Sequence, residues 1–183
     1  LITTILATST VVGAVSWLNY AFRLFQFPVG VLSVSIAGSN LVHFSESWKK
    51  GEKEKAVSFL KTSYLISFLV LIPSFSLLYA MAKPSIHLIF ERGAFLPSDT
   101  DQSTLALKMY LLGLPFYGCY KVFAPTFYTL DKPKIPVLIS MFCIGLNVIF
   151  CLALVDRFGF SILALGTSLS MCVNVLCQSV LLK

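Results

Sequence analysis

The chain has 183 residues, of which 57% are hydrophobic and only 12% are charged, and its mean hydropathy is +0.85. This balance excludes an ordinary soluble globular domain and indicates an integral membrane protein. The net charge of +6 comes from lysines and arginines that mostly lie between apolar stretches, rather than in a basic patch with interleaved aromatic residues. Nucleic acid is therefore not an expected partner.

Long apolar segments predict an all-α, polytopic transmembrane helix bundle with about five full spans, because each is near or above the ~20 residues that a spanning helix needs. The expected spans are residues 13–44, 56–82, 103–129, 135–155 and 159–182. Residues 1–8 are typical of the end of an earlier span, and the chain begins without Met inside an apolar stretch. We therefore expect residues 1–183 to be a single transmembrane fragment, packed in the bilayer against the remaining helices of a larger transporter.

The first segment would extend about 48 Å as one straight helix, which is longer than a ~30 Å hydrocarbon core. Pro28, followed by Gly30, predicts a bend near its middle because proline removes a backbone donor and clashes with the preceding turn. Pro73 and Pro115 predict similar bends in the second and third segments. Bent spans around a cavity are common in transporters.

Basic residues are distributed unevenly between the two sides of this expected topology. One side holds Lys49, Lys50, Lys53, Lys55, Lys61, Lys132, Lys134 and Lys183, and the other holds Lys83, Arg92, Lys108 and Arg157. The positive-inside rule predicts that the first side is cytoplasmic. The connection 45–55 mixes lysines with glutamates, which is typical of a solvated turn; contact with anionic lipid headgroups is the alternative.

Arg23 is the only residue with a full charge between Leu1 and Ser45, and a cation at the membrane centre costs roughly 3 kcal/mol on insertion scales. Lys121 is the second cation expected inside a span, whereas the acids fall in connections or at span ends. Guanidinium and ammonium groups suit an anionic ligand, and arginine can hold two phosphate oxygens at once. We identify Arg23 and Lys121 as candidate substrate-binding residues. The alternatives are carbonyls or an acid from another helix for Arg23, and snorkelling to the interface for Lys121.

Catalytic motifs are missing from the sequence: it contains no GxxxxGK[ST], no GxSxG and no HExxH. The five cysteines lie in apolar segments without a CxxC pair or a histidine at ligand spacing, so neither a metal site nor a disulfide is expected. We expect no catalytic residue and no cofactor. A transporter needs none, because it requires only a site that opens alternately to two sides.

Four motifs resemble those of the MviN/MurJ family of bacterial lipid II flippases, and they occur in the family's order. They are SWLNYAFRLFQFPVGV (16–31), FERGAF (90–95), KVFAPTFY (121–128) and DKPKIPV (131–137). The resemblance implies membership of the multidrug/oligosaccharidyl-lipid/polysaccharide exporter superfamily. It also implies alternating-access transport of lipid II, the undecaprenyl-diphosphate-linked peptidoglycan precursor, across the bacterial cytoplasmic (inner) membrane, with Arg23 at the position of the family's cavity arginine.

The chain departs from the family pattern at two positions. Phe22 stands where the family commonly has aspartate directly before the arginine, and Thr3 stands where an acid often lies near the end of the preceding span. Both departures leave Arg23 with fewer neighbouring acids. They keep two alternatives open: an exporter of another polyprenyl-linked saccharide or of a drug, and a non-transporting membrane scaffold that has lost the site.

Overall fold

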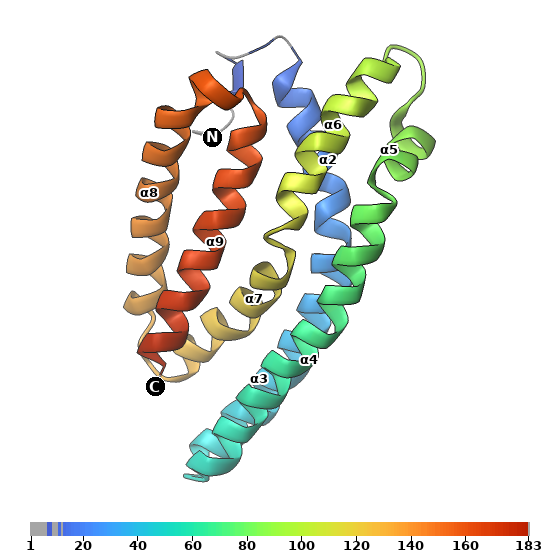
Figure 1. Cartoon of the computed structure of the whole chain (residues 1–183). Coiled ribbons are helices and arrows are strands. Elements are labelled where there is room, and N and C mark those ends of the chain that lie inside the picture. The colour runs from blue at the N-terminus through green and yellow to red at the C-terminus, as the bar shows by residue number, and fades with distance from the viewer. Residues whose placement is uncertain (1–6, 9–10, 12, 183) are drawn as a thin grey trace.

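In the computed structural model, which describes residues 7–8, 11 and 13–182, the chain folds into an elongated bundle of helices (Figure 1). The helices are α2 (Ala14–Pro28), η1 (Val29–Ser33), α3 (Val34–Lys49), α4 (Lys53–Ala80), α5 (Ala82–Phe90), α6 (Pro97–Leu111), α7 (Leu114–Thr129), α8 (Lys134–Phe158) and α9 (Ser161–Leu181). No strand occurs among these described residues, and the predicted all-α class is confirmed. Thr3 lies outside the described residues.

The first long helical stretch changes its register where Pro28 predicts a bend. The segment η1 that follows Pro28 is π-helical, and the N–H of Val34 donates to the carbonyl of Val29, five residues earlier. A proline without an N–H leaves one carbonyl of the regular ladder without its donor, and a π-helical turn is one way in which the following residues restore the ladder. The whole stretch Ala14–Lys49 is continuous and 36 residues long.

The segment 103–129, expected as one bent span, consists of two helices. Helix α6 ends at Leu111 and α7 begins at Leu114, with Pro115 in its first turn. Proline is tolerated in the first turn of a helix, where no N–H is needed, but not in its interior. The expected bend at Pro115 is therefore a complete break.

Four helical stretches in the described part of the chain are long and apolar enough to cross a membrane. They are Ala14–Lys49, Lys53–Ala80, Lys134–Val155 and Ser161–Leu181. Large apolar side chains are exposed along them, including Leu69 on α4 at 74% and Ile149 on α8 at 71%. Apolar surface on this scale is expected against lipid or further helices, not against water.

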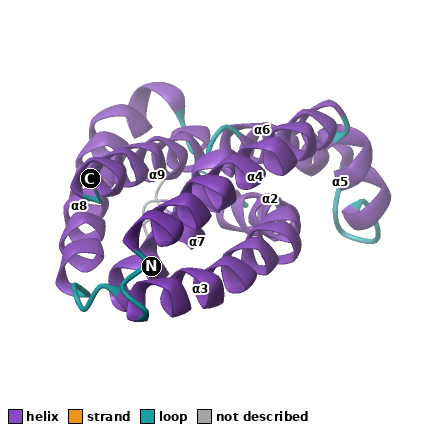
Figure 2. Ribbon diagram, turned by 90° about the horizontal axis from the view of Figure 1, so that it is seen from below, coloured by secondary structure: helices purple, strands orange, loops and turns teal. Residues whose placement is uncertain are grey.

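The helices pack in a chain of neighbours across the bundle: α2 contacts α6, α7 contacts α3, α4 and α9, and α8 contacts α9. Seen from below, α5 lies at one edge and α8 at the opposite edge (Figure 2). The larger buried cluster includes Leu18, Phe25 and Leu107, and the smaller one includes Phe44 and Phe123. Helices α2 and α7, which carry the two candidate cations, thus both belong to the packed interior of the bundle.

Candidate functional site

Arg23 lies on the exposed side of α2. The buried residues of this helix recur every three or four positions and form one face: Ala14, Leu18, Ala21, Phe25 and Pro28. At 100° per residue, Arg23 lies about 180° around the helix axis from the middle of that face. Its guanidinium group has no ion pair, hydrogen bond or ring contact within the described part of the chain.

Phe22 points in a different direction from its neighbour Arg23. Its ring lies 5.8 Å from the ring of Phe25 and 5.5 Å from the ring of Tyr110, measured between centroids. The position at which the family commonly has an acid is therefore directed toward an aromatic cluster between α2 and α6. Such ring pairs stabilise helix contacts by about 0.5–1.5 kcal/mol beyond area burial.

Lys121 lines a groove of about 220 Å³ between α2, η1 and α7. The lining residues are Phe22, Phe25, Gln26, Val29, Gly30, Val34, Tyr117 and Lys121. Arg23 does not line the groove, but it precedes Gln26 by three residues, and residues at this spacing are neighbours on a helix surface. The structure therefore places Lys121 in the groove wall. Arg23 lies outside the groove, one helical turn from Gln26, which lines it.

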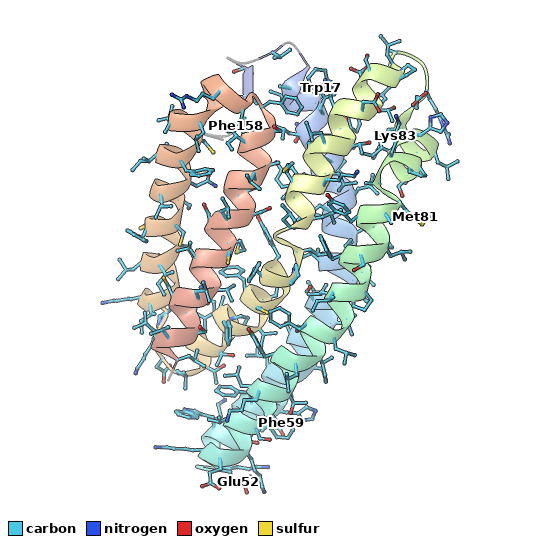
Figure 3. The ribbon with its side chains drawn as sticks, in the orientation of Figure 1. Trp17, Glu52, Phe59, Met81, Lys83 and Phe158 are labelled. Carbon is cyan, nitrogen blue, oxygen red and sulfur yellow. The ribbon has the colours of Figure 1, made fainter. Side chains whose placement is uncertain are left out.

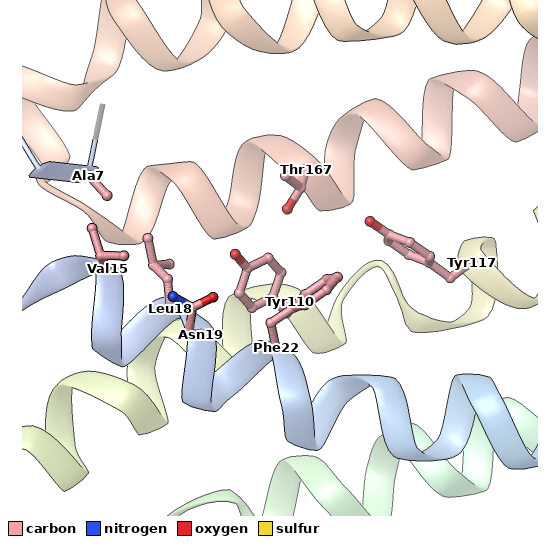
Figure 4. A pocket seen from close by; sticks show the side chains of 8 residues that line it. All are labelled: Ala7, Val15, Leu18, Asn19, Phe22, Tyr110, Tyr117 and Thr167. Atoms are coloured by element: carbon pink, nitrogen blue, oxygen red, sulfur yellow. The ribbon is translucent and has the colours of Figure 1, made fainter. Parts of the chain in front are cut away.

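Helix α2 and the break between α6 and α7 enclose a second cavity of about 250 Å³. Its lining residues are Ala7, Val15, Leu18, Asn19, Phe22, Tyr110, Tyr117 and Thr167. Figure 4 shows Asn19, Phe22 and Tyr110 on one side, with Thr167 facing them from α9. Tyr117 lines this cavity, the groove of Lys121, and a third cavity of about 290 Å³ between α7, α8 and α9.

The break that positions Tyr110 and Tyr117 depends on a serine from α9. The hydroxyl of Ser168 lies 2.8 Å from the carbonyl oxygen of Met109 and 3.1 Å from that of Tyr110. The last carbonyls of a helix lack partners, and an unpartnered carbonyl is costly in a membrane. Gly113 permits the close approach, because a Cβ there would lie 2.9 Å from the Cα of Ser168. The sequence alone does not predict this contact, because Ser168 lies 59 and 58 residues from the two carbonyls, and Pro115 is compatible with a bend as well as with a break.

At the other end of α2, the first two motifs of the sequence contact each other. The ring of Tyr20 lies 4.8 Å from that of Phe90 and 5.2 Å from that of Phe95. The indole N–H of Trp17 donates to Asp99 Oδ1 at 2.8 Å, while Asp99 Oδ2 accepts from the backbone N–H of Leu96. These contacts fix the start of α2 to the α5–α6 connection. They therefore set the position of Arg23.

Near the start of α2, acidic side chains outside the expected spans form hydrogen bonds and ion pairs with neighbouring residues. Glu91 accepts hydrogen bonds from Thr100 and pairs with His87, and both contacts hold the pKa of Glu91 below its usual value. Lys83 pairs with Asp101 at 2.6 Å. Among the described residues, no group of three His, Cys, Asp or Glu side chains could hold a metal ion, and the five cysteines are free. Lys121 thus shares its groove with the amide of Gln26, the hydroxyl of Tyr117 and apolar side chains.

The chain matches known proteins along its whole length. The family profile of the lipid II flippase MurJ covers residues 1–183. The probable lipid II flippase MurJ of Buchnera aphidicola subsp. Acyrthosiphon pisum is 32% identical over 98% of this chain, and that of Rickettsia prowazekii is 30% identical over 92%. The matches cover 35% and 33% of those proteins, so the chain spans about a third of their length.

A solved structure of lipid II flippase MurJ in an inward closed conformation also matches. Its TM-score is 0.85 at 28% sequence identity, covering 93% of this chain and 36% of that protein. The resemblance carried by the four motifs is confirmed, as is the expectation of a polytopic membrane bundle that forms part of a larger transporter fold. The chain belongs to the MurJ family of bacterial lipid II flippases.

Proposed function

We propose that the full-length protein containing this chain transports lipid II across the bacterial cytoplasmic membrane by alternating access. In this proposal Arg23 binds the diphosphate of the lipid, and Lys121 contacts the same group from the groove wall. Family membership over residues 1–183 and the inward closed relative support a transporter that opens alternately to two sides.

A single observation supports the site most strongly: Arg23 carries its charge on a face of a membrane-crossing helix where no described acid pairs with it. A lone cation in that setting is costly and marks a functional site by default. A diphosphate offers several anionic oxygens, and guanidinium binds two of them in parallel hydrogen bonds. Lys121 of α7 adds a second positive charge, from the wall of the groove that Gln26 of α2 also lines.

The proposed topology places the α3–α4 and α7–α8 connections in the cytoplasm, as the distribution of lysines predicts. Helices α6 and α7 together would form the remaining span, because the Tyr110 carbonyl at their break accepts from the backbone N–H of Gly113 and the hydroxyl of Ser168 can donate to that of Met109. The protein then acts without covalent chemistry, by binding and reorienting the lipid.

One observation favours a different candidate, a scaffold that no longer transports. Phe22 packs among aromatic rings at the position where the motif resemblance implies an acid, and loss of a polar site would leave such packing. An exporter of another polyprenyl-linked saccharide or of a drug would share the fold and the cation.

Complementation separates these functions. The full-length gene is expressed in a bacterium whose own lipid II flippase can be depleted, and growth is scored together with membrane insertion of the protein. Restored growth is expected for a lipid II flippase. Normal insertion without growth would contradict the proposal and favour the scaffold or another exporter, and binding of purified protein to other polyprenyl-linked lipids would distinguish the two.

A further inference from the structure

The α3–α4 hairpin projects beyond the ends of α8 and α9 at the lysine-rich end of the molecule (Figure 1). Its turn joins Lys49 to Lys53, and Glu52 lies at the tip (Figure 3). The hairpin is therefore the part of the described chain that reaches farthest toward this side of the membrane. The side chains of the hairpin determine which molecules it can bind on that side.

One exposed stripe of α4 changes from apolar to basic toward the tip. Leu65, Leu69 and Ile72 are 66%, 74% and 48% exposed, and they lie on the side of α4 opposite to its buried residues. Lys61 continues the same stripe one turn closer to the tip and is also exposed. An apolar stripe that ends in a lysine is expected where hydrocarbon gives way to headgroups, because the long side chain carries its ammonium group to the interface.

Aromatic side chains occupy the same level of the hairpin. His43 of α3 stacks with Phe59 of α4 at 5.5 Å, and Phe44 stacks with Trp48 at 5.9 Å, measured between ring centroids. The ammonium group of Lys53 lies 5.8 Å from the centre of the Trp48 ring. Aromatic rings concentrate at the membrane–water interface, where one end is apolar and the other is polar.

The charges of the tip are mostly unpaired and predominantly positive. Five lysines (Lys49, Lys50, Lys53, Lys55 and Lys61) stand against three glutamates (Glu46, Glu52 and Glu54). Within the described residues the ion pair found at the tip joins Lys55 to Glu52 at 3.1 Å. Lys61 lies about 10 Å along the helix from Glu54, so the acids at the turn do not neutralise the lysine nearest the hydrocarbon.

We propose that this surface, residues 43–61, binds the phosphate groups of anionic phospholipids in the adjoining leaflet. Lys53 and Lys61 contact the headgroups, the exposed rings of His43 and Phe59 lie among the glycerol and carbonyl groups, and the Leu65 stripe contacts the acyl chains. The membrane's own lipid is the ligand because Lys61 continues an apolar, lipid-facing stripe and Lys53 lies nearer the tip on the same helix. This site is separate from Arg23 and does not depend on transport of lipid II.

The test uses the purified full-length protein in detergent, titrated with phosphatidylglycerol or with neutral phosphatidylcholine, and bound lipid is counted by native mass spectrometry. The test variant combines Lys53→Gln with Lys61→Gln. The matched control combines Lys132→Gln with Lys134→Gln, which removes two exposed lysines from the α7–α8 connection on the same side. Thermal unfolding of each variant reports whether the fold is retained, which is expected because all four side chains are exposed.

The proposal predicts that the test variant binds phosphatidylglycerol about tenfold more weakly, whereas the control changes by less than about twofold. Phosphatidylcholine binding should be the same in all proteins. Equal losses in both variants would overturn the proposal, because they would indicate diffuse attraction to net charge. Unchanged binding in the test variant would also overturn it and would leave the surface to a protein partner.

Discussion

Phe22 and Arg23 are adjacent in α2, yet they belong to different surroundings. Phe22 packs against the rings of Phe25 and Tyr110, whereas Arg23 lies on the exposed side of the helix. Consecutive residues of a helix point about 100° apart, so an acid at position 22 would be directed toward the rings and the groove, not along the guanidinium. Phe22, in place of the acid that the family pattern implies, thus alters the packing beside the groove more than it alters the surroundings of Arg23.

At the residue scale, Gly118 is a position where one added methyl group should matter. A Cβ there would overlap Cδ1 of the fully buried Leu71 and would lie 3.2 Å from Oγ of the buried Ser33. Because the fully buried Leu71 would have to change its side-chain conformation within the packed interior, Gly118→Ala should destabilise the fold by about 1–3 kcal/mol and lower its thermal unfolding midpoint in detergent.

Gly145→Ala is the matched control for Gly118→Ala. It makes the same substitution in α8, where an added Cβ meets no atom within 4 Å. We expect this variant to unfold at the same temperature as the unmodified protein or slightly higher, because alanine is the better helix former. Equal midpoints for the two variants would show that α4, η1 and α7 do not pack as closely as described.

At the element scale, the sequence predicted where the helices lie better than where one of them breaks. Charged residues and turns bound the apolar runs, so the spans at α4, α8 and α9 could be recognised from composition alone. The division at Leu111 could not, because apolar residues continue on both sides and Pro115 is compatible with either a bend or a new first turn. Ser168, whose hydroxyl lies near the carbonyls at the break, is 58 residues from Tyr110 in the chain.

The sequence likewise predicts part of the candidate site. A lone cation in an apolar run identifies Arg23 without any structure, and the same holds for Lys121. Which helix face each cation occupies depends on the packing of α2 against α6 and of α7 against α3, α4 and α9. The shared position of Tyr117 in three cavities likewise depends on the break and on long-range packing, which local sequence patterns do not encode.

Ser168→Ala tests the break between α6 and α7. The substitution removes the hydroxyl that lies near the carbonyls of Met109 and Tyr110, and leaves these groups without it in a membrane-embedded region. We expect a loss of about 1–3 kcal/mol in the free energy of unfolding. Hydrogen exchange should also become faster around residues 109–117.

Ser179→Ala is the control for the break. Ser179 lies in the same helix, but it is partly exposed and donates only to the carbonyl of Leu176 in its own turn. Its removal should change stability by no more than about 0.5 kcal/mol. If Ser168→Ala were equally harmless, the broken helix would have to be stabilised by groups other than this hydroxyl.

At the scale of the whole molecule, the two ends of the bundle have different roles. The end with α5 is fastened to α2 by the Trp17–Asp99 hydrogen bond and by the rings around Tyr20. The opposite end carries the basic hairpin that we assign to phospholipid binding. Arg23 and the groove of Lys121 lie along helices that connect the two ends, which is the placement that our proposal of lipid transport requires.

The central claim is that the charge of Arg23 acts on the substrate during transport. The most direct measurement is translocation of lipid II in cells that depend on the full-length protein, compared among Arg23→Ala, Arg23→Lys and the control Arg157→Ala at the end of α8. We predict that Arg23→Ala loses at least about tenfold in translocation, since a contact between charged groups contributes about 1.5–3 kcal/mol. Arg23→Lys should retain part of the activity and Arg157→Ala nearly all of it. Full translocation by Arg23→Ala, at normal amounts of inserted protein, would contradict the account.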